Sequence, residues 1–210
     1  RILEGGCGMA QNVWALHQAG FEVHGVDYAQ KTVDKINEHV PELKISCADV
    51  RGLPFEDGYF DGYWSLGVIE HFYDGYLPIA MEMNRVTRSG GYVFLTFPCI
   101  SRFRNQKIKT GDYLPWQERE ELINRFYQFV LSARQVEKDF SALGFQLVRE
   151  KPMAGFKGFK DETKSPWIQN FMQKMYDSSN YGIKAATWAL GQVLSPWAGH
   201  MQLMVFKKTD

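Results

Sequence analysis

Apolar and polar positions alternate with two different periods along the first hundred residues. Apolar residues at every second position predict short strands at 1–5, 21–27, 43–49, 60–67 and 92–98. Between these strands apolar residues recur three or four positions apart, as at Val33, Ile36 and Val40, which is the period of a helix. Strands that alternate with helices pair in parallel through right-handed crossovers, so the pattern predicts a doubly wound α/β sheet.

The second half of the chain continues this pattern with one long interruption. A helix beginning near Ser132 and ending at Gly144 precedes a sixth strand at 145–150, and a seventh strand is predicted at 200–208. The residues between these strands, 151–199, are too many for a plain connection, so we expect an insertion.

The insertion should contain a helix with one apolar face. Its apolar positions are Ile183, Ala186, Leu190 and Leu194. Contact with a membrane or an apolar substrate is one interpretation of this face. Packing against the core is favoured, because the helix lacks the strongly basic face of a membrane-surface helix.

Composition narrows the classes of function. With 24 basic and 24 acidic residues, the chain lacks the positive field that binds nucleic acid without sequence preference, so no nucleic-acid partner is expected. Cys7, Cys47 and Cys99 lie far apart, which favours neither a disulfide framework nor a metal site and fits a reducing cytoplasm. No apolar run approaches the roughly 20 residues that span a bilayer, so we expect a cytoplasmic protein without stable membrane insertion. Composition does not indicate an oligomeric state.

The chain begins inside the first strand, so we expect a further N-terminal segment. Three glycines follow that strand in the sequence LEGGCGMA, at the point where open α/β sheets bind ligands. The dinucleotide pattern G-x-G-x-x-G starting at Gly6 would need a glycine at Gln11, which argues against NAD. The observed pattern is an acidic residue followed by small residues at alternate positions, Glu4-x-Gly6-x-Gly8-x-Ala10.

Five segments in this order resemble the class I S-adenosylmethionine-dependent methyltransferases. They are ILEGGCGMA, GVDYA, CADVRGLPFEDGYFDGYWSLGVIEHF, RVTRSGGYVFLTFP and FYQFVLSARQVEKDFSALGF. The resemblance implies a single Rossmann-like domain over 1–210 with S-adenosylmethionine as cofactor. It also implies a mostly parallel seven-stranded sheet in the order 3-2-1-4-5-7-6, with strand 7 antiparallel.

The same resemblance assigns roles around the cofactor. Glu4 would order the glycine loop, and Gly5, Gly6 and Gly8 would let the backbone approach the methionine and ribose, with the amides of Gly6 and Gly8 exposed. Asp27 would accept hydrogen bonds from both ribose hydroxyls.

The remaining cofactor positions follow the second, third and fourth strands. Tyr28 would line the adenine, and the Asp49 carboxylate with the Val50 amide would bind its amino edge. The backbone of Ser65, Leu66 and Gly67 would pass beneath the methionine.

His71 is the candidate catalytic residue, because an imidazole titrates near neutral pH and can act as a general base. A packing role at the strand exit is the alternative. Methyl transfer can also proceed by alignment alone, without a catalytic residue. The strand lacks the Asn-Pro-Pro-Tyr sequence with which relatives hold planar amino groups, so methylation of bases or glutamine is not indicated.

Two further segments bear on the acceptor. The basic residues of SRFRNQKIK would hold an anionic acceptor or, as is more common for such runs, form a solvated loop. The insertion at 151–199 would cover the acceptor site, with apolar walls from Phe156, Phe159 and Trp167, or would pack on the sheet or on another subunit. Aromatic faces near the sulfonium would come from Tyr28, Tyr63, Trp64, Phe97 and Trp116, although most of these are expected in the core.

The sequence therefore predicts methyl transfer from S-adenosylmethionine to a small-molecule, glycan or lipid-linked acceptor, at oxygen or nitrogen. The alternative is a catalytically silent domain that binds the cofactor in a structural or regulatory role.

Overall fold

A computed structural model describes residues 1–113 and 120–209, so Trp116 lies outside the described residues. The chain divides into two compact units. The first consists of Arg1–Phe97, Arg134–Glu150 and Met204–Asp210, and the second of Pro98–Ala133 and Lys151–Leu203.

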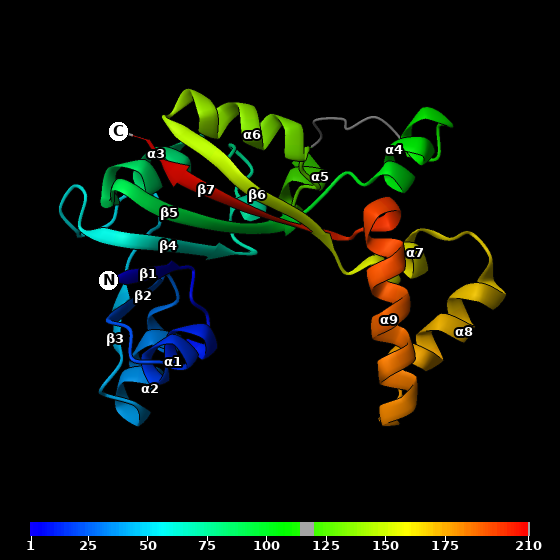
Figure 1. Ribbon diagram of the computed structural model, residues 1–210, viewed down its shortest axis with the longest axis horizontal. Coiled ribbons are helices and arrows are strands. Elements are labelled where there is room, and N and C mark those ends of the chain that lie inside the picture. The colour runs from blue at the N-terminus through cyan, green and yellow to red at the C-terminus, as the bar shows by residue number, and fades with distance from the viewer. Residues whose placement is uncertain (114–119, 210) are drawn as a thin grey trace. The chain divides into compact units, whose positions relative to one another are not determined.

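The strands form one seven-stranded sheet in the order β3-β2-β1-β4-β5-β7-β6 (Figure 1). Strand β1 pairs in parallel with β2 and β4, β2 with β3, and β4 with β5, while β7 is antiparallel. Their bounds are Ile2–Gly5 (β1), Val23–Asp27 (β2), Lys44–Cys47 (β3), Phe60–Leu66 (β4), Thr87–Pro98 (β5), Phe145–Met153 (β6) and Met201–Lys208 (β7). The predicted fold class and strand order are confirmed.

The helices of the first unit bury one face each against this sheet. They are α1 (Gln11–Gln18), α2 (Gln30–His39), the 3-10 helix η1 (Ile69–His71), α3 (Leu77–Val86) and α6 (Ala133–Ala142), whose first residue lies in the second unit. Val13 of α1 and Val33 and Ile36 of α2 pack with Val23 and Ile45 of the sheet in one cluster. Burial of these side chains places the first residues of α1 and α2 at the carboxyl ends of β1 and β2.

Strand β5 begins earlier than the sequence indicates. The segment RSGG suggests a turn before a strand at 92–98, whereas β5 already starts at Thr87, directly after α3. The pairing of β5 with β4 shifts register between Phe60 and Gly62. A Cβ on Gly91 would lie 2.9 Å from the carbonyl oxygen of Asp61. Position 91 therefore needs a glycine because the backbones of β4 and β5 approach closely at this register shift, and not because a turn is required.

The second unit is mainly helical. Its helices are α4 (Arg102–Lys109), α5 (Glu120–Asn124), α7 (Gly155–Glu162), α8 (Pro166–Tyr176) and α9 (Tyr181–Ala198). The helix predicted around 183–194 is present as α9, but the expected core packing is wrong, because Ile183, Ala186 and Leu190 are exposed. Within residues 1–113 and 120–209, no helix is both long enough and apolar enough to cross a membrane.

Candidate cofactor-binding site

The glycine loop between β1 and α1 is shaped first by packing inside the first unit. A Cβ on Gly5 would overlap the hydroxyl of Tyr63, and one on Gly6 would lie 2.6 Å from Val68 Cγ2. Gly6 and Gly8 have φ angles of +74° and +51°, which disfavour other residues. A Cβ on Gly8 would meet nothing within 4 Å. Gly8 therefore marks the open side of the loop, where a ligand can approach the backbone.

Asp27 ties this loop to the end of β2. Its Oδ2 accepts a hydrogen bond from the Gly8 N–H at 2.8 Å and its Oδ1 from the Ala29 N–H at 2.9 Å. The Gly6 N–H donates to the Val26 carbonyl at 2.8 Å. The expectation that the Gly6 and Gly8 amides are exposed is therefore wrong, because the loop folds back onto acceptors at the end of β2. Each Asp27 oxygen keeps the capacity to accept one more bond.

Glu4 connects β1 to the first turn of α1. Its side chain is buried, and Oε1 accepts a hydrogen bond from Asn12 Nδ2 at 2.7 Å. Burial raises the Glu4 pKa above its ordinary value, and the Asn12 hydrogen bond opposes this shift. Within the described part of the chain, Glu4 Oε2 has no hydrogen-bond partner. These contacts are those of a loop-ordering acid that retains one available oxygen.

The positions assigned to adenine lie at the ends of β2 and β3. Tyr28 is 84% exposed, and Val50 is buried beside the exposed Asp49. Asp49 forms an ion pair with Arg51 at 2.6 Å, and Arg51 hydrogen bonds lower the Asp49 pKa. An adenine amino group at Asp49 would have to share the carboxylate with this guanidinium.

The exit of β4 carries two buried polar side chains. Ser65 is 1% exposed and Glu70 is 2% exposed. The structure gives neither Ser65 Oγ nor Glu70 Oε2 a hydrogen-bond partner among the residues it describes. Between them, Leu66 is half-buried and Gly67 has a φ of +74°. Burial raises the Glu70 pKa above its ordinary value.

Unpartnered buried polar atoms are uncommon in folded proteins. Here three of them, from Glu4, Ser65 and Glu70, occur at or just beyond the carboxyl ends of β1 and β4, which are adjacent strands with Glu4 opposite Trp64. The available oxygens at this edge suit a ligand that carries polar or cationic groups.

The residues of the Glu-His pair at 70 and 71 have opposite environments. His71 ends η1 and is exposed, whereas the Glu70 side chain is enclosed. Sequence reasoning selected His71 from its titration range and gave Glu70 no role. The signal that separates them is the apolar context of Glu70, which follows Val68 and Ile69 directly.

The basic segment after β5 is neither a loop nor an open anion site. Ser101 caps α4 by accepting a hydrogen bond from the Arg104 N–H at 3.3 Å. Arg104 is buried and pairs with Glu162 at 2.6 Å, and Lys107 contacts the same carboxylate at 3.3 Å. These two cations neutralise an internal acid of the second unit, so they are not available to an anionic acceptor. Arg102 and Lys109 are exposed.

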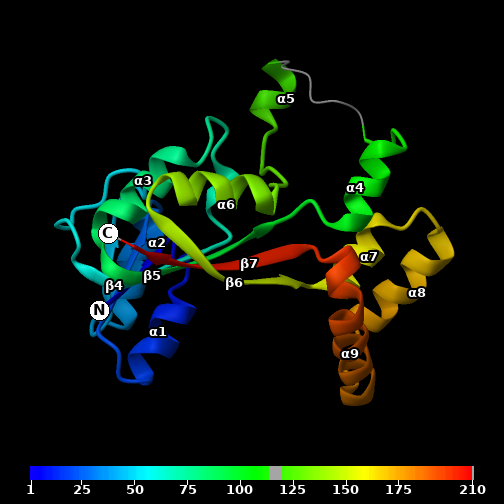
Figure 2. The same cartoon turned by 45° about the horizontal axis from the view of Figure 1, so that its top comes forward.

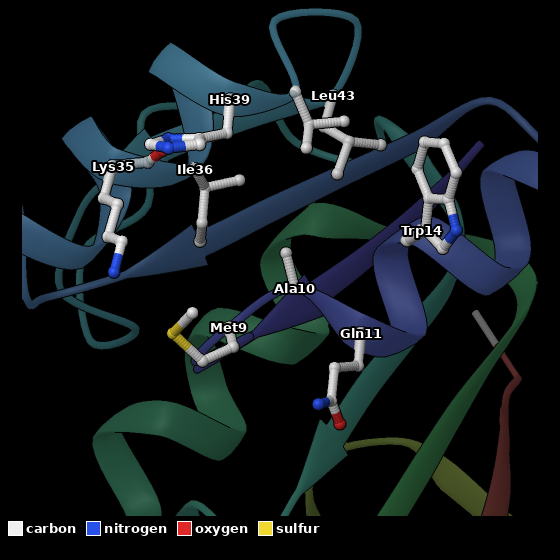
Figure 3. A pocket seen from close by; sticks show the side chains of 9 residues that line it. Met9, Ala10, Gln11, Trp14, Lys35, Ile36, His39 and Leu43 are labelled. Atoms are coloured by element: carbon white, nitrogen blue, oxygen red, sulfur yellow. The ribbon is translucent and has the colours of Figure 1, made fainter.

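A pocket of about 430 Å³ lies between α1 and α2, outside the residues assigned to the cofactor (Figure 3). Ala10, Trp14 and Ile36 give it a mainly apolar lining, with Lys35 and His39 on the α2 side. It begins at Met9, directly after the glycine loop, but it contains no unpartnered carboxylate. The geometry therefore favours the β1 and β4 edge over this pocket as the cofactor site.

Comparisons with known proteins indicate the family of the chain. Residues 3–95 match the family model described as "Methyltransferase domain". The chain is 25% identical over 146 residues to a "Probable S-adenosylmethionine-dependent methyltransferase" of Mycolicibacterium smegmatis, covering 70% of this chain and 52% of that protein. It is 28% identical over 192 residues to "Phosphoethanolamine N-methyltransferase 1" of Arabidopsis thaliana, covering 87% and 37%. Residues 3–95 therefore form a methyltransferase domain, and the motifs and fold of the chain support the class I S-adenosylmethionine-dependent type.

A solved methyltransferase structure supports the fold. The phosphoethanolamine N-methyltransferase 2 of Haemonchus contortus, in complex with S-adenosyl-L-methionine, superimposes with a TM-score of 0.64 at 18% identity. The match covers 100% of this chain and 49% of that one. The chain spans about half or less of the length of the relatives described here.

The cofactor of this family is S-adenosylmethionine, and the residues at the β1 and β4 edge fit it. The molecule carries an ammonium and a sulfonium cation, and the available oxygens of Glu4 and Glu70 are suited to positive charge. The buried Asp27 carboxylate has capacity left for hydroxyl donors.

Proposed function

We propose that this methyltransferase transfers a methyl group from S-adenosylmethionine to an oxygen or nitrogen of a small-molecule, glycan or lipid-linked acceptor. The observation that carries the proposal is the set of unpartnered buried oxygens of Glu4, Ser65 and Glu70 beside the open Gly8. A packed structural domain would have no reason to keep three such atoms at one sheet edge.

Each assigned residue then has a defined task. Asp27 fixes the glycine loop through Gly8 and Ala29 and accepts the ribose hydroxyls with its remaining capacity. Glu4 faces the positive end of the methionine portion. Tyr28, the Asp49 carboxylate and the Val50 amide bind the adenine. The Ser65 to Gly67 backbone supports the methionine.

The acceptor end of the site lies beyond β4. When bound, S-adenosylmethionine supplies an electrophilic methyl group, and the chain has to align an acceptor atom behind it. Glu70 is enclosed whereas His71 is exposed, and the Glu70 carboxylate would attract a cationic or hydroxylated acceptor. His71 would serve as the base only with its ring turned toward the acceptor. The phosphoethanolamine methyltransferase relative supports nitrogen as one acceptor atom.

We also propose that the insertion at 151–199 covers the acceptor. Fewer of its aromatic residues can contact the acceptor than the sequence suggests. Phe156 is buried in the second unit, and Phe159 stacks on Phe103 at 5.7 Å between centroids, so both are packing residues there. Trp167 is 75% exposed and is the one of the three aromatic candidates that is free to contact an acceptor.

A cytoplasmic, reducing setting is part of the proposal. All three cysteines are free thiols, and burial raises the pKa of Cys99 to about 11 and that of Cys7 still further, which makes both thiols unreactive. The alternative function is a silent domain that binds S-adenosylmethionine without turnover.

The test combines cofactor binding with transfer. Calorimetry with S-adenosylmethionine is followed by incubation of the protein with labelled cofactor and a small-molecule cell extract. We expect binding and labelled products from the native chain, and weaker binding with less labelled product from Asp27→Ala. Asp34→Ala is the matched control, because Asp34 is exposed and its carboxylate accepts a hydrogen bond from Gln30 of the same helix. Binding without label transfer would support the silent domain, and no binding would overturn both proposals.

A further inference from the structure

Helices α8 and α9 expose an unusual number of large apolar side chains. We call α8, α9 and their connection, residues 166–198, the apolar hairpin. The two helices lie side by side in both views (Figures 1 and 2). Their exposed large apolar residues are Trp167, Phe171, Tyr176, Tyr181, Ile183, Trp188, Leu190, Val193 and Trp197. Trp167 and Trp188 are 75% and 69% exposed, so these rings lie almost fully in solvent.

The exposure surrounds α9 and is not confined to one stripe. Residues 181–186 and 188–190 are all exposed, which covers more than two helical turns on every side. The buried positions Gly191, Ser195 and Ala198 belong to the C-terminal part, where the Ser195 hydroxyl accepts a hydrogen bond from the Gly155 N–H at 3.0 Å. α9 is therefore anchored at its C-terminal end and projects an apolar N-terminal half.

Large exposed apolar side chains gathered on two neighbouring helices mark a surface that meets another apolar medium. A groove on a folded partner fits one helix face, whereas the boundary of a lipid leaflet takes up apolar side chains from both helices of the hairpin. Tyrosine and tryptophan, which place an apolar ring and a polar tip at the boundary, are characteristic of membrane interfaces.

The charge of the hairpin selects the kind of lipid. Neither α8 nor α9 contains an acidic residue, and their charged side chains are Lys174 and Lys184. Asp177 lies in the connection, so the hairpin holds two lysines and one acidic residue, although the whole chain has no net charge. Anionic headgroups attract such a segment.

We propose that the apolar hairpin docks reversibly on an anionic lipid membrane by shallow insertion. Trp167, Trp188 and Tyr181 lie at the level of the headgroups, and Lys174 and Lys184 face the anionic phosphates. Because no described helix is able to cross a bilayer, the hairpin enters one leaflet only. The proposal holds whichever atom accepts the methyl group, and it assigns Trp167 to the membrane in place of the acceptor.

Vesicle flotation of the full chain tests this inference. The probes are vesicles of phosphatidylcholine with one quarter phosphatidylglycerol, and vesicles of phosphatidylcholine alone. We expect flotation with the anionic vesicles, a blue shift of tryptophan emission on binding, and at least tenfold weaker binding to the neutral vesicles.

Variants locate the surface. The double variant Trp167→Ser with Trp188→Ser should lose at least tenfold in vesicle binding at an unchanged melting temperature, since both rings lie in solvent. The matched control is Phe21→Ser with Met81→Ser, which removes two exposed apolar side chains, 52% and 60% exposed, from the first unit. Lys174→Glu with Lys184→Glu should abolish the preference for anionic vesicles.

Three outcomes would overturn the inference. One is absence of flotation with either vesicle, and another is equal loss in the hairpin and control variants. The third is a concentration-dependent dimer in sedimentation velocity that the tryptophan variant dissolves, which would assign the surface to a second copy.

Discussion

At the residue scale, Glu70 has an unusual environment for a carboxylate of the candidate cofactor site. A carboxylate that is 2% exposed with one unpartnered oxygen favours the protonated form, so its pKa is raised in the folded state. A raised carboxyl pKa means that the folded state binds more protons than the unfolded state above about pH 4.5. Stability therefore falls as pH rises from 4.5 through the folded-state pKa.

Glu70→Gln removes this ionisation and keeps the shape of the side chain. We expect equal melting temperatures for the native chain and the variant at pH 4, and a higher melting temperature for the variant at pH 8. Thermal unfolding followed by circular dichroism between these values measures the difference. Parallel curves for the two proteins across the whole range would show that Glu70 is solvated, against the burial described here.

Asp27 has two structural bonds to lose besides any bond to the cofactor. In Asp27→Ala the N–H groups of Gly8 and Ala29 lose their acceptor, so we expect the free energy of unfolding to fall by about 1 to 3 kcal/mol. S-adenosylmethionine binding should weaken by about 2 to 4 kcal/mol, the value of two hydrogen bonds to a charged group with partial replacement by water. Denaturant titration and calorimetry measure the two effects separately. Destabilisation with unchanged affinity would limit Asp27 to its role in the loop.

At the element scale, the sequence was informative where a periodic pattern and a local signal agreed. The strands and helices of the first hundred residues follow from alternation together with stop residues such as Gly20 and Pro41. The glycine loop was placed correctly, but its hydrogen bonds were not, because the acceptors at Val26 and Asp27 come from another strand. Only the folded chain shows that Gly5 is required by Tyr63.

Elements that depend on contacts far apart in the sequence were interpreted less well. Helix α4 looked like a charged loop, because the pairing of Arg104 with Glu162 spans 58 positions. The apolar residues of α9 were assigned to the core because the helix lacks a strongly basic face. The absence of such a face does not distinguish a core helix from one that meets another apolar medium.

The contact between α7 and α9 depends on two small residues. A Cβ on Gly158 would overlap the carbonyl oxygen of Ala198, which is backbone and cannot move aside easily. Gly158→Ala should therefore destabilise the second unit by about 1 to 3 kcal/mol. Gly52→Ala is the control, because a Cβ there meets no atom within 4 Å. Denaturant unfolding of the two variants should separate them clearly, and equal midpoints would mean that the helices tolerate a wider spacing.

At the scale of the whole molecule, the two compact units carry different proposed functions. The assigned cofactor residues all lie in Arg1–Phe97, while the apolar hairpin belongs entirely to Lys151–Leu203. Strands β5, β6 and β7 each have residues in both units, so the chain passes between them along the sheet. A ligand of the first unit and a surface of the second can therefore be examined separately in one protein.

Hydrogen exchange with and without S-adenosylhomocysteine tests whether the ligand protects the first unit alone. A ligand present at 100 times its dissociation constant stabilises the bound state by about 2.7 kcal/mol, so amides protected through the site should exchange about 100-fold more slowly. We expect this slowing in residues 3–10, 26–29 and 65–70, where the loop, the end of β2 and the exit of β4 meet the cofactor. Amides of α9 should exchange at the same rate with and without the ligand. Equal slowing in α9 would show that the units open as one, and slowing confined to the α1 and α2 pocket around Trp14 would move the cofactor site there.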